Sequence, residues 1–247
     1  MKLSVCITAY DQNELTIVHI KECMNSLRIP DEIIVVNDGG SDELEKMVEE
    51  IPDKKCSLIY AKIEQDILWN QCGARNLGIY LSTGDLIALE DNDHIPSKDF
   101  YKQAEELINN GYDRVVGKKR WVVPYEDALK QNWNVIGSRG KAVVISFCRR
   151  EFLLDIKGFD ENFVGNYGWD VPDFNHRMNF VGAKTIYSGS YYVVDCYSNM
   201  KNRTFYGDTK ITKMAAVNYH TYKGTCLSNV SQSTKGILNF NFRVKRL

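Results

Sequence analysis

The chain has 247 residues, of which 44% are hydrophobic and 26% charged, so it can bury a core, and the disordered and fibrous classes are excluded. Lys and Arg number 31 against 32 for Asp and Glu, a formal charge of -1 that excludes a dedicated nucleic-acid binder, because affinity for a polyanion needs an excess of basic residues. No apolar run approaches the roughly 20 residues that cross a bilayer, and no signal-peptide pattern is present, so we expect no transmembrane segment and a cytoplasmic location.

The first ninety residues alternate between strand and helix patterns. Short apolar runs rich in β-branched residues predict strands over Leu3 to Thr8, Glu32 to Val36, Ser57 to Ala61 and Leu86 to Leu89. Helical spacing predicts helices over Glu14 to Leu27, Asp42 to Glu50 and Trp69 to Leu81. This order predicts a parallel sheet covered by helices, with ligands bound outside the carboxyl ends of the strands.

The second half of the chain is less regular. It carries helical patterns over Lys98 to Asn109, Arg149 to Ile156 and Val171 to Phe180, and strand patterns over Arg114 to Val123 and Ala142 to Phe147. Thr185 to Cys196 contains one or two strands, and the alternating, basic tail NFNFRVKRL predicts an edge strand or an interaction segment. Because no repeat or linker interrupts the chain, we expect one compact α/β domain over residues 1–247. The seven cysteines form no C-x-x-C pair, which favours free thiols over a zinc cluster.

Two polar clusters follow the first two predicted strands. Thr8-Ala9-Tyr10-Asp11 ends the first strand, and Asn37-Asp38-Gly39-Gly40-Ser41 ends the second. Tyr10 could lie against a flat ring, and Asp38 could accept a hydrogen bond from a ring N–H, so together they indicate a nucleobase pocket. The alternative interpretation is a purely structural turn, since Asp before Gly is common in turns.

A third cluster, Glu90-Asp91-Asn92-Asp93, follows the fourth strand. Carboxylates crowded at a strand end repel one another unless a cation lies among them, and oxygen ligands select Mg²⁺ or Mn²⁺. Asp91 and Asp93 point the same way if the strand continues, because strand side chains repeat every two residues. The pair could also start at Glu90, although Asp91 and Asp93 lie at a better distance from Pro96. The alternative is a solvated acidic loop.

A fourth cluster contains Gly158-Phe159-Asp160-Glu161 and then Tyr167-Gly168-Trp169-Asp170. Asp170 stands at a helix start, and Asp173 lies on nearly the same helical face, so either carboxylate can serve as a general base. In the alternative interpretation Asp170 caps the helix and Asp173 lies in its first turn.

Taken in order and spacing, these pieces resemble the family-two glycosyltransferases with the GT-A fold, a Rossmann-like, mostly parallel sheet flanked by helices. The matching segments are SVCITAY from Ser4, EIIVVNDG from Glu32, Gly73-Ala74-Arg75-Asn76, GDLIALEDND from Gly84, Gly158-Phe159-Asp160-Glu161, and Gly168-Trp169-Asp170 with Arg177. The likeness extends from residue 3 to about residue 182. It implies a nucleotide-binding half over residues 1–93 and an acceptor-binding half over residues 94–247.

The resemblance implies a role for each matching position. Asp38 corresponds to the residue that recognises the base and Tyr10 to its stacking neighbour, next to Thr8 and Ala9. Arg75 lies near the base and phosphates, and Asp91-Asn92-Asp93 is similar to the D-x-D motif that binds Mn²⁺ or Mg²⁺ on the sugar nucleotide. Asp170 matches the region of the catalytic base, where family members commonly show Glu-Asp and this chain shows Asp170-Val171. Asp173 is therefore kept as the alternative base.

Three further expectations complete the site. A family metal ligand some twenty-five residues past the base has no matching His, so either Asp195 or His220 takes that place. Trp169 and Arg139, together with Trp121, are the expected acceptor-facing residues. The segment from Asn199 to Thr209 is expected to close over the donor as a lid.

The implied activity is a metal-dependent, inverting transfer of a sugar from a UDP- or GDP-linked donor to a hydroxyl of a glycan or glycoprotein acceptor. Two alternatives differ in class. One is a catalytically silent sugar- or nucleotide-binding module on the same fold, which the presence of Asp91, Asp93 and Asp170 disfavours. The other is a sugar-phosphate nucleotidyltransferase, which would need a Gly-rich basic loop after the first strand. A dinucleotide oxidoreductase is discounted, because no G-x-G-x-x-G follows that strand.

Overall fold

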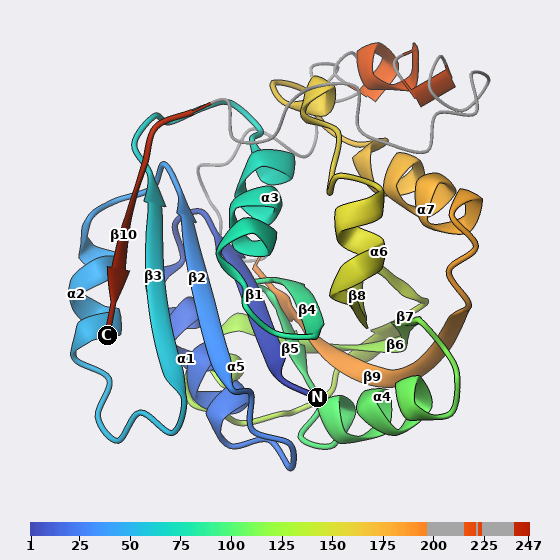
Figure 1. The fold of residues 1–247 in the computed structure, drawn as a ribbon. Coiled ribbons are helices and arrows are strands. Elements are labelled where there is room, and N and C mark those ends of the chain that lie inside the picture. The colour runs from blue at the N-terminus through green and yellow to red at the C-terminus, as the bar shows by residue number, and fades with distance from the viewer. Residues whose placement is uncertain (197–214, 221, 224–239) are drawn as a thin grey trace.

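The computed structural model describes residues 1–196, 215–220, 222–223 and 240–247. Within these residues ten strands form one mixed sheet in the order β10-β3-β2-β1-β4-β8-β6-β9-β5, with β7 paired to β6 (Figure 1). The strands are β1 (Leu3–Ala9), β2 (Glu32–Asp38), β3 (Ser57–Ile63), β4 (Leu86–Asp91), β5 (His94–Pro96), β6 (Arg114–Pro124), β7 (Gly137–Arg139), β8 (Ala142–Arg149), β9 (Thr185–Asp195) and β10 (Phe242–Arg246). The helices are α1 (Asn13–Met24), α2 (Glu43–Glu49), α3 (Gln71–Leu81), α4 (Phe100–Asn109), α5 (Tyr125–Leu129), α6 (Arg150–Asp155) and α7 (Asp170–Phe180), with one 3-10 turn at Glu161–Phe163.

The centre of the sheet is the parallel set β3-β2-β1-β4, which is covered on both faces. Alternate side chains of each strand enter different cores, as Val5 and Cys6 of β1 do. The core on Val5's side contains side chains of α1, α2 and α4, whereas the core on Cys6's side contains those of α3, α6 and α7. Burial on both faces explains why these strands are continuous apolar runs in the sequence. The predicted helix-covered α/β fold is confirmed.

The structure differs from the predicted elements in particular places. The first helix ends at Met24 and not at Leu27, whose N–H donates instead to the carbonyl of Lys98 across 2.8 Å. Thr185 to Asp195 is one strand. The sequence analysis missed β5, α5 and β7, which have three, five and three residues, because such short elements complete no hydrophobic period.

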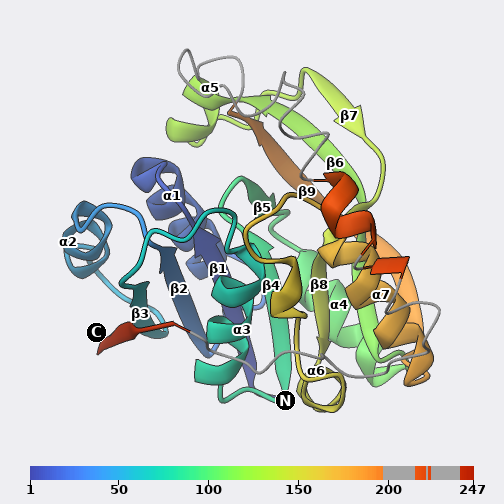
Figure 2. The same ribbon diagram turned by 90° about the horizontal axis from the view of Figure 1, so that it is seen from above.

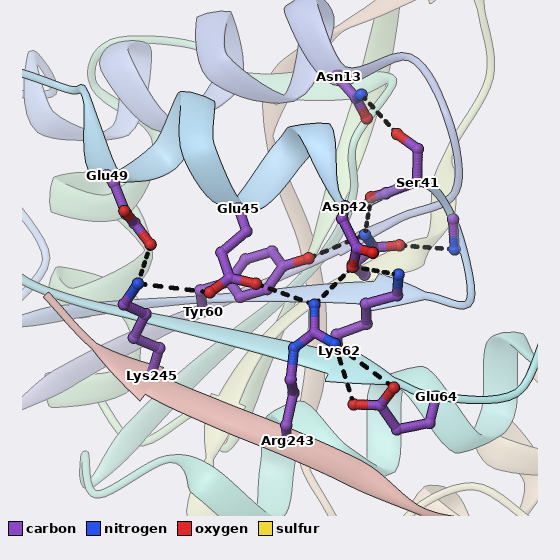
Figure 3. A network of polar contacts seen from close by, with 12 residues as sticks. Asn13, Ser41, Asp42, Glu45, Glu49, Tyr60, Lys62, Glu64, Arg243 and Lys245 are labelled. Atoms are coloured by element: carbon purple, nitrogen blue, oxygen red, sulfur yellow. Dashed lines mark hydrogen bonds and ion pairs between the residues drawn. The ribbon is translucent and has the colours of Figure 1, made fainter.

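The basic tail forms the edge strand β10, which runs antiparallel to β3. Its cations face acidic side chains of α2, of the residue just before α2 and of the residue just after β3 (Figure 3). Arg243 contacts Asp42, Glu45 and Glu64, and Lys245 contacts Glu45 and Glu49. Charges along a sheet edge disfavour pairing with another chain, so β10 closes the sheet at this side.

Among the described residues, no helix is both long and apolar enough to cross a bilayer. The described cysteines are free thiols, as expected. The lid expected over Asn199 to Thr209 lies outside the described residues.

Candidate functional site

The candidate site lies where the parallel strands β1, β2 and β4 end side by side (Figure 2). Register places Ala9 opposite Asn37 and Thr8 opposite Asp91, so the three polar clusters predicted at strand ends meet at one edge of the sheet. The Thr8 hydroxyl donates to Asp91 Oδ1 at 3.2 Å. The amide of Asn92 donates to the carbonyl of Thr8 at 3.1 Å, so the D-x-D segment is fixed directly to β1.

Asp38, the last residue of β2, is 8% exposed and accepts a hydrogen bond from Asn70 Nδ2 at 2.8 Å. Burial raises the pKa of Asp38 from 3.8 to about 7, with Asp66 adding to the rise, while Asn70 and Arg75 oppose it. Tyr10 is 41% exposed beside it, with its hydroxyl 3.5 Å from Asp66 Oδ2. A buried carboxyl next to an open aromatic ring has the parts that a nucleobase pocket needs, one acceptor and one stacking surface.

Arg75 of α3 joins two carboxylates that come from distant parts of the chain. Its side chain is 2% exposed. Nη2 donates to Asp91 at 2.9 Å and 3.2 Å, and Nη1 donates to Asp170 Oδ2 at 3.0 Å. Burial alone would lower the pKa of Arg75, but the charges of Asp91 and Asp170 outweigh it and hold the guanidinium protonated. One cation therefore holds the D-x-D segment against the start of α7.

Asp91, Asp93 and His94 form a group whose potential ligand atoms all lie within 4.8 Å of one another. His94 Nδ1 lies 2.7 Å from Asp93 Oδ1, whereas its Nε2 is buried without a hydrogen-bond partner. Burial alone would raise the pKa of Asp93, but the charge and hydrogen bond of His94 hold that pKa below its usual value. Two carboxylates and an imidazole nitrogen fit a divalent cation such as Mn²⁺, which accepts oxygen and nitrogen ligands.

Neither expected completing ligand belongs to this group. His220 is exposed on the helical residues 215–220, with its ring 6.1 Å from that of Tyr219. Asp195 ends β9 one residue after Val194, whose amide donates to the carbonyl of Asp93 at 2.9 Å. Asp195 thus lies near the D-x-D backbone, while the third potential ligand atom close to Asp91 and Asp93 belongs to His94.

The two candidate bases have different surroundings. Asp173 forms an ion pair with Arg177 at 2.8 Å, and each side chain is 1% exposed, so its carboxylate is fixed in a structural pair. Asp170 begins α7, and burial raises its pKa, with Arg75 offsetting part of the rise. A raised pKa suits a group that must accept a proton. Asp170 also shares its partner Arg75 with Asp91 of the D-x-D segment, whereas Asp173 is paired with Arg177, so the geometry favours Asp170 over Asp173.

The expected acceptor-facing residues lie on different elements. Trp169 has a left-handed backbone (φ 68°) just before Asp170, and its ring stacks on that of Tyr222 at 5.2 Å. A non-glycine residue held at positive φ is strained, and such strain gathers at functional sites. Arg139 is exposed on β7, and Trp121 lies on β6 next to it.

Further residues support the site, and among them the sequence analysis missed Asn70 and His19 as well as His94. Asn70 holds Asp38, and Asn76 donates to Phe159 O at 2.9 Å, which ties α3 to the loop before α7. Buried His19 and Glu90 pair at 2.7 Å directly beneath the D-x-D segment. His94 adjoins the acidic pair in the sequence, and that adjacency was the signal that could have identified it.

A family model described as Glycosyl transferase family 2 matches residues 4–168. The amylovoran biosynthesis glycosyltransferase AmsB of Erwinia amylovora is 30% identical over 109 residues, which are 44% of this chain and 36% of that protein. The chain spans 13% and 36% of the length of the two curated relatives that it matches.

Two solved structures share the fold. The mannosyltransferase PcManGT of Pyrobaculum calidifontis, in complex with GDP-Man and Mn²⁺, superposes with a TM-score of 0.57 at 18% identity, covering 77% of this chain and 56% of that one. Residues 1–349 of TarS from S. aureus, in complex with UDP-GlcNAc, superpose with a TM-score of 0.60 at 17% identity, covering 78% and 58%. At these identities the likeness concerns the fold, and it agrees with the GT-A architecture expected from the sequence.

Proposed function

The chain belongs to glycosyl transferase family 2, and from that premise we propose that its strand-end cluster is the donor site of a metal-dependent, inverting glycosyltransferase. The donor is a UDP- or GDP-linked sugar, and the acceptor is a hydroxyl of a glycan or glycoprotein. The observation that carries the proposal is the Arg75 bridge, because it brings the D-x-D carboxylate Asp91 and the candidate base Asp170 onto one guanidinium.

In this proposal the base of the nucleotide lies on Tyr10, and Asp38 accepts a hydrogen bond from a ring N–H. Support comes from the exposure of Tyr10 and the burial of Asp38 at the end of β2. A buried carboxylate gives strong selectivity, since an analogue without the N–H would leave it unpaired. Thr8 and Ala9 form the floor beneath the nucleotide.

Asp91, Asp93 and His94 would hold Mn²⁺ or Mg²⁺ on the donor. When bound, the cation stabilises the negative charge that develops on the leaving diphosphate. Arg75 keeps its positive charge at the same place and draws Asp91 into position. The neighbour with GDP-Man and Mn²⁺ supports the choice of ion, and the two neighbours with different nucleotides leave both UDP and GDP as candidates.

Asp170 accepts the proton of the acceptor hydroxyl. As that proton leaves, the hydroxyl oxygen forms a bond to the anomeric carbon, and the bond from this carbon to the diphosphate oxygen breaks. One displacement inverts the configuration at the anomeric carbon. Arg75 orients Asp170 through Nη1, and burial of the carboxyl raises its pKa toward that of a useful base.

The test uses the purified chain with a panel of UDP- and GDP-sugars, with and without Mn²⁺, and measures both binding and release of the nucleoside diphosphate. We expect one nucleotide to bind more tightly with Mn²⁺, and Asp91→Asn with Asp93→Asn to abolish that gain. Asp170→Asn should keep donor binding and stop release, whereas Asp155→Asn, at an exposed carboxylate ending α6, should change neither. Binding without any release would favour the silent module, and absence of binding to every sugar nucleotide would refute the proposal.

A further inference from the structure

The β6–β7 hairpin carries a row of cations, one of which, Arg139, is among the expected acceptor-facing residues. Arg120 of β6 and Arg139 of β7 are register partners, and Lys118 and Lys141 lie two residues away from them. Figure 2 shows β7 beside the outer part of β6, with β9 on the other side of β6. Like charges placed directly opposite each other destabilise a strand pair, so the Arg120–Arg139 arrangement works against the fold.

No carboxylate among the described residues forms an ion pair with this row. Two of its members make contacts of other kinds: Arg120 Nε donates to Gly140 O at 3.0 Å, and Lys141 Nζ lies 3.8 Å from the ring centre of Tyr187. A Cβ added at Gly140 would meet no atom within 4 Å, so there is open space next to the pair. Within the described part of the chain, the positive charge of the hairpin is therefore not neutralised by a carboxylate partner.

The arginine row lies on the same face of the sheet as the proposed metal site. Register joins Arg120 to Tyr191 of β9, and Tyr191 to Pro96 of β5. Register partners share a face, and so does His94, which stands two residues before Pro96. Arg139, Arg120 and His94 thus lie on one face of the sheet, with the buried Tyr191 of β9 between Arg120 and β5.

Electrostatics agree with this placement. Burial lowers the pKa of Arg120, and the charge of Arg139 lowers it further, while Asp93 opposes both. The charge of Arg120 also acts on His94. Arg120 is therefore near enough to the proposed metal ligands to influence them, and Arg139 extends the positive field outward from there.

We propose that the Arg120–Arg139 row, with Lys141, binds an oxyanion, a carboxylate or phosphate, carried by the acceptor. The inference rests on the proposed function, since it defines the chemical class of the acceptor for the same site. Two guanidinium groups side by side suit this ligand because each can donate two parallel hydrogen bonds to a carboxylate or phosphate. The row leads away from the nucleotide pocket formed by Tyr10 and Asp38, so its ligand is the acceptor and the donor's diphosphate remains on the metal site.

The test measures binding of two small anions, trigalacturonate and tripolyphosphate, and of neutral maltotriose, without metal or nucleotide. The protein should bind at least one anion but not maltotriose, with an affinity that falls as salt increases. Arg139→Gln combined with Lys141→Gln should weaken that binding roughly tenfold. The matched control, Lys46→Gln with Lys102→Gln, removes the same charge from exposed positions of α2 and α4 and should leave binding unchanged.

A second arm separates the two sources of oxyanion. Binding of UDP and of GDP with Mn²⁺ should be the same in the Arg139→Gln, Lys141→Gln variant as in the unmodified protein. If the variant weakens nucleotide binding and leaves the anion titration unchanged, the row serves the donor and the inference is overturned. It is also overturned if neither anion binds, or if both double variants lose anion binding equally. Because the first arm contains no nucleotide, a failure of the proposed donor chemistry would not affect its result.

Discussion

Removing the Arg75 guanidinium should destabilise the protein more than removing any exposed cation. In Arg75→Met the buried carboxylates Asp91 and Asp170 lose the cation between them. Their side chains are only 16% and 10% exposed, so water compensates little. Breaking a buried ion pair in this way costs about 3–5 kcal/mol. For a chain of this size, that loss corresponds to a fall in Tm of roughly 6–20 °C.

The assay is thermal and denaturant unfolding of matched variants. Arg243→Met is the control, because Arg243 contacts three carboxylates but is 43% exposed, and exposed ion pairs contribute only about 0.2–1 kcal/mol each. Adding Asp91→Asn to Arg75→Met removes one unpaired charge and should recover part of the lost stability. The reasoning is refuted if Arg75→Met loses no more than Arg243→Met, or if the added Asp91→Asn lowers stability further.

Three further predictions follow from the site. The pKa of Asp38 is 3.8 in the unfolded chain and about 7 in the folded one, so the folded state binds more protons between these pH values. The free energy of unfolding should therefore fall by up to about 4 kcal/mol as pH rises from about 4 to 7. Asp38→Asn should flatten this pH dependence, and an unchanged pH profile of stability in that variant would contradict the raised pKa. In a metal titration His94→Ala should weaken Mn²⁺ binding roughly tenfold, and His220→Ala should leave it unchanged. Weaker Mn²⁺ binding in His220→Ala but not in His94→Ala would identify His220 as the ligand instead. Gly39→Ala should lower the free energy of unfolding in urea by at least about 1 kcal/mol and weaken nucleotide binding, because Gly39 has φ 77° and an added Cβ would lie 2.7 Å from Asp66 Cα. Equal stability of the Gly39→Ala variant and the unmodified protein would show that the loop can move aside.

The first half of the fold, over residues 1–93, could be predicted from sequence because its signals are local. The runs around Val5, Ile34 and Ala88 are apolar on both faces, as strands of a covered parallel sheet are, and each ends in polar residues. The ends of parallel strands meet at one edge, so Thr8, Asp38 and Asp91 could be placed together before their contacts were known.

The remainder depends on contacts between distant segments. Arg75 and Asp170 are 95 residues apart, and no periodicity indicates that one guanidinium joins Asp170 to Asp91. His94 adjoins the acidic pair in the sequence, but only the folded chain shows that its Nε2 is buried without a hydrogen-bond partner. The pairing of Arg120 with Arg139 likewise depends on the register of a hairpin whose second strand has three residues, too short to predict.

The most direct test of the account is the electron paramagnetic resonance of Mn²⁺ titrated into the protein in the presence of UDP or GDP. The account predicts that bound Mn²⁺ increases when one of the two nucleotides is added, and that Asp91→Asn with Asp93→Asn removes the bound signal. If neither nucleotide changes the amount of bound Mn²⁺, or if Mn²⁺ still binds to the Asp91→Asn, Asp93→Asn variant, the assignment of Asp91, Asp93 and His94 as the donor's metal site is contradicted.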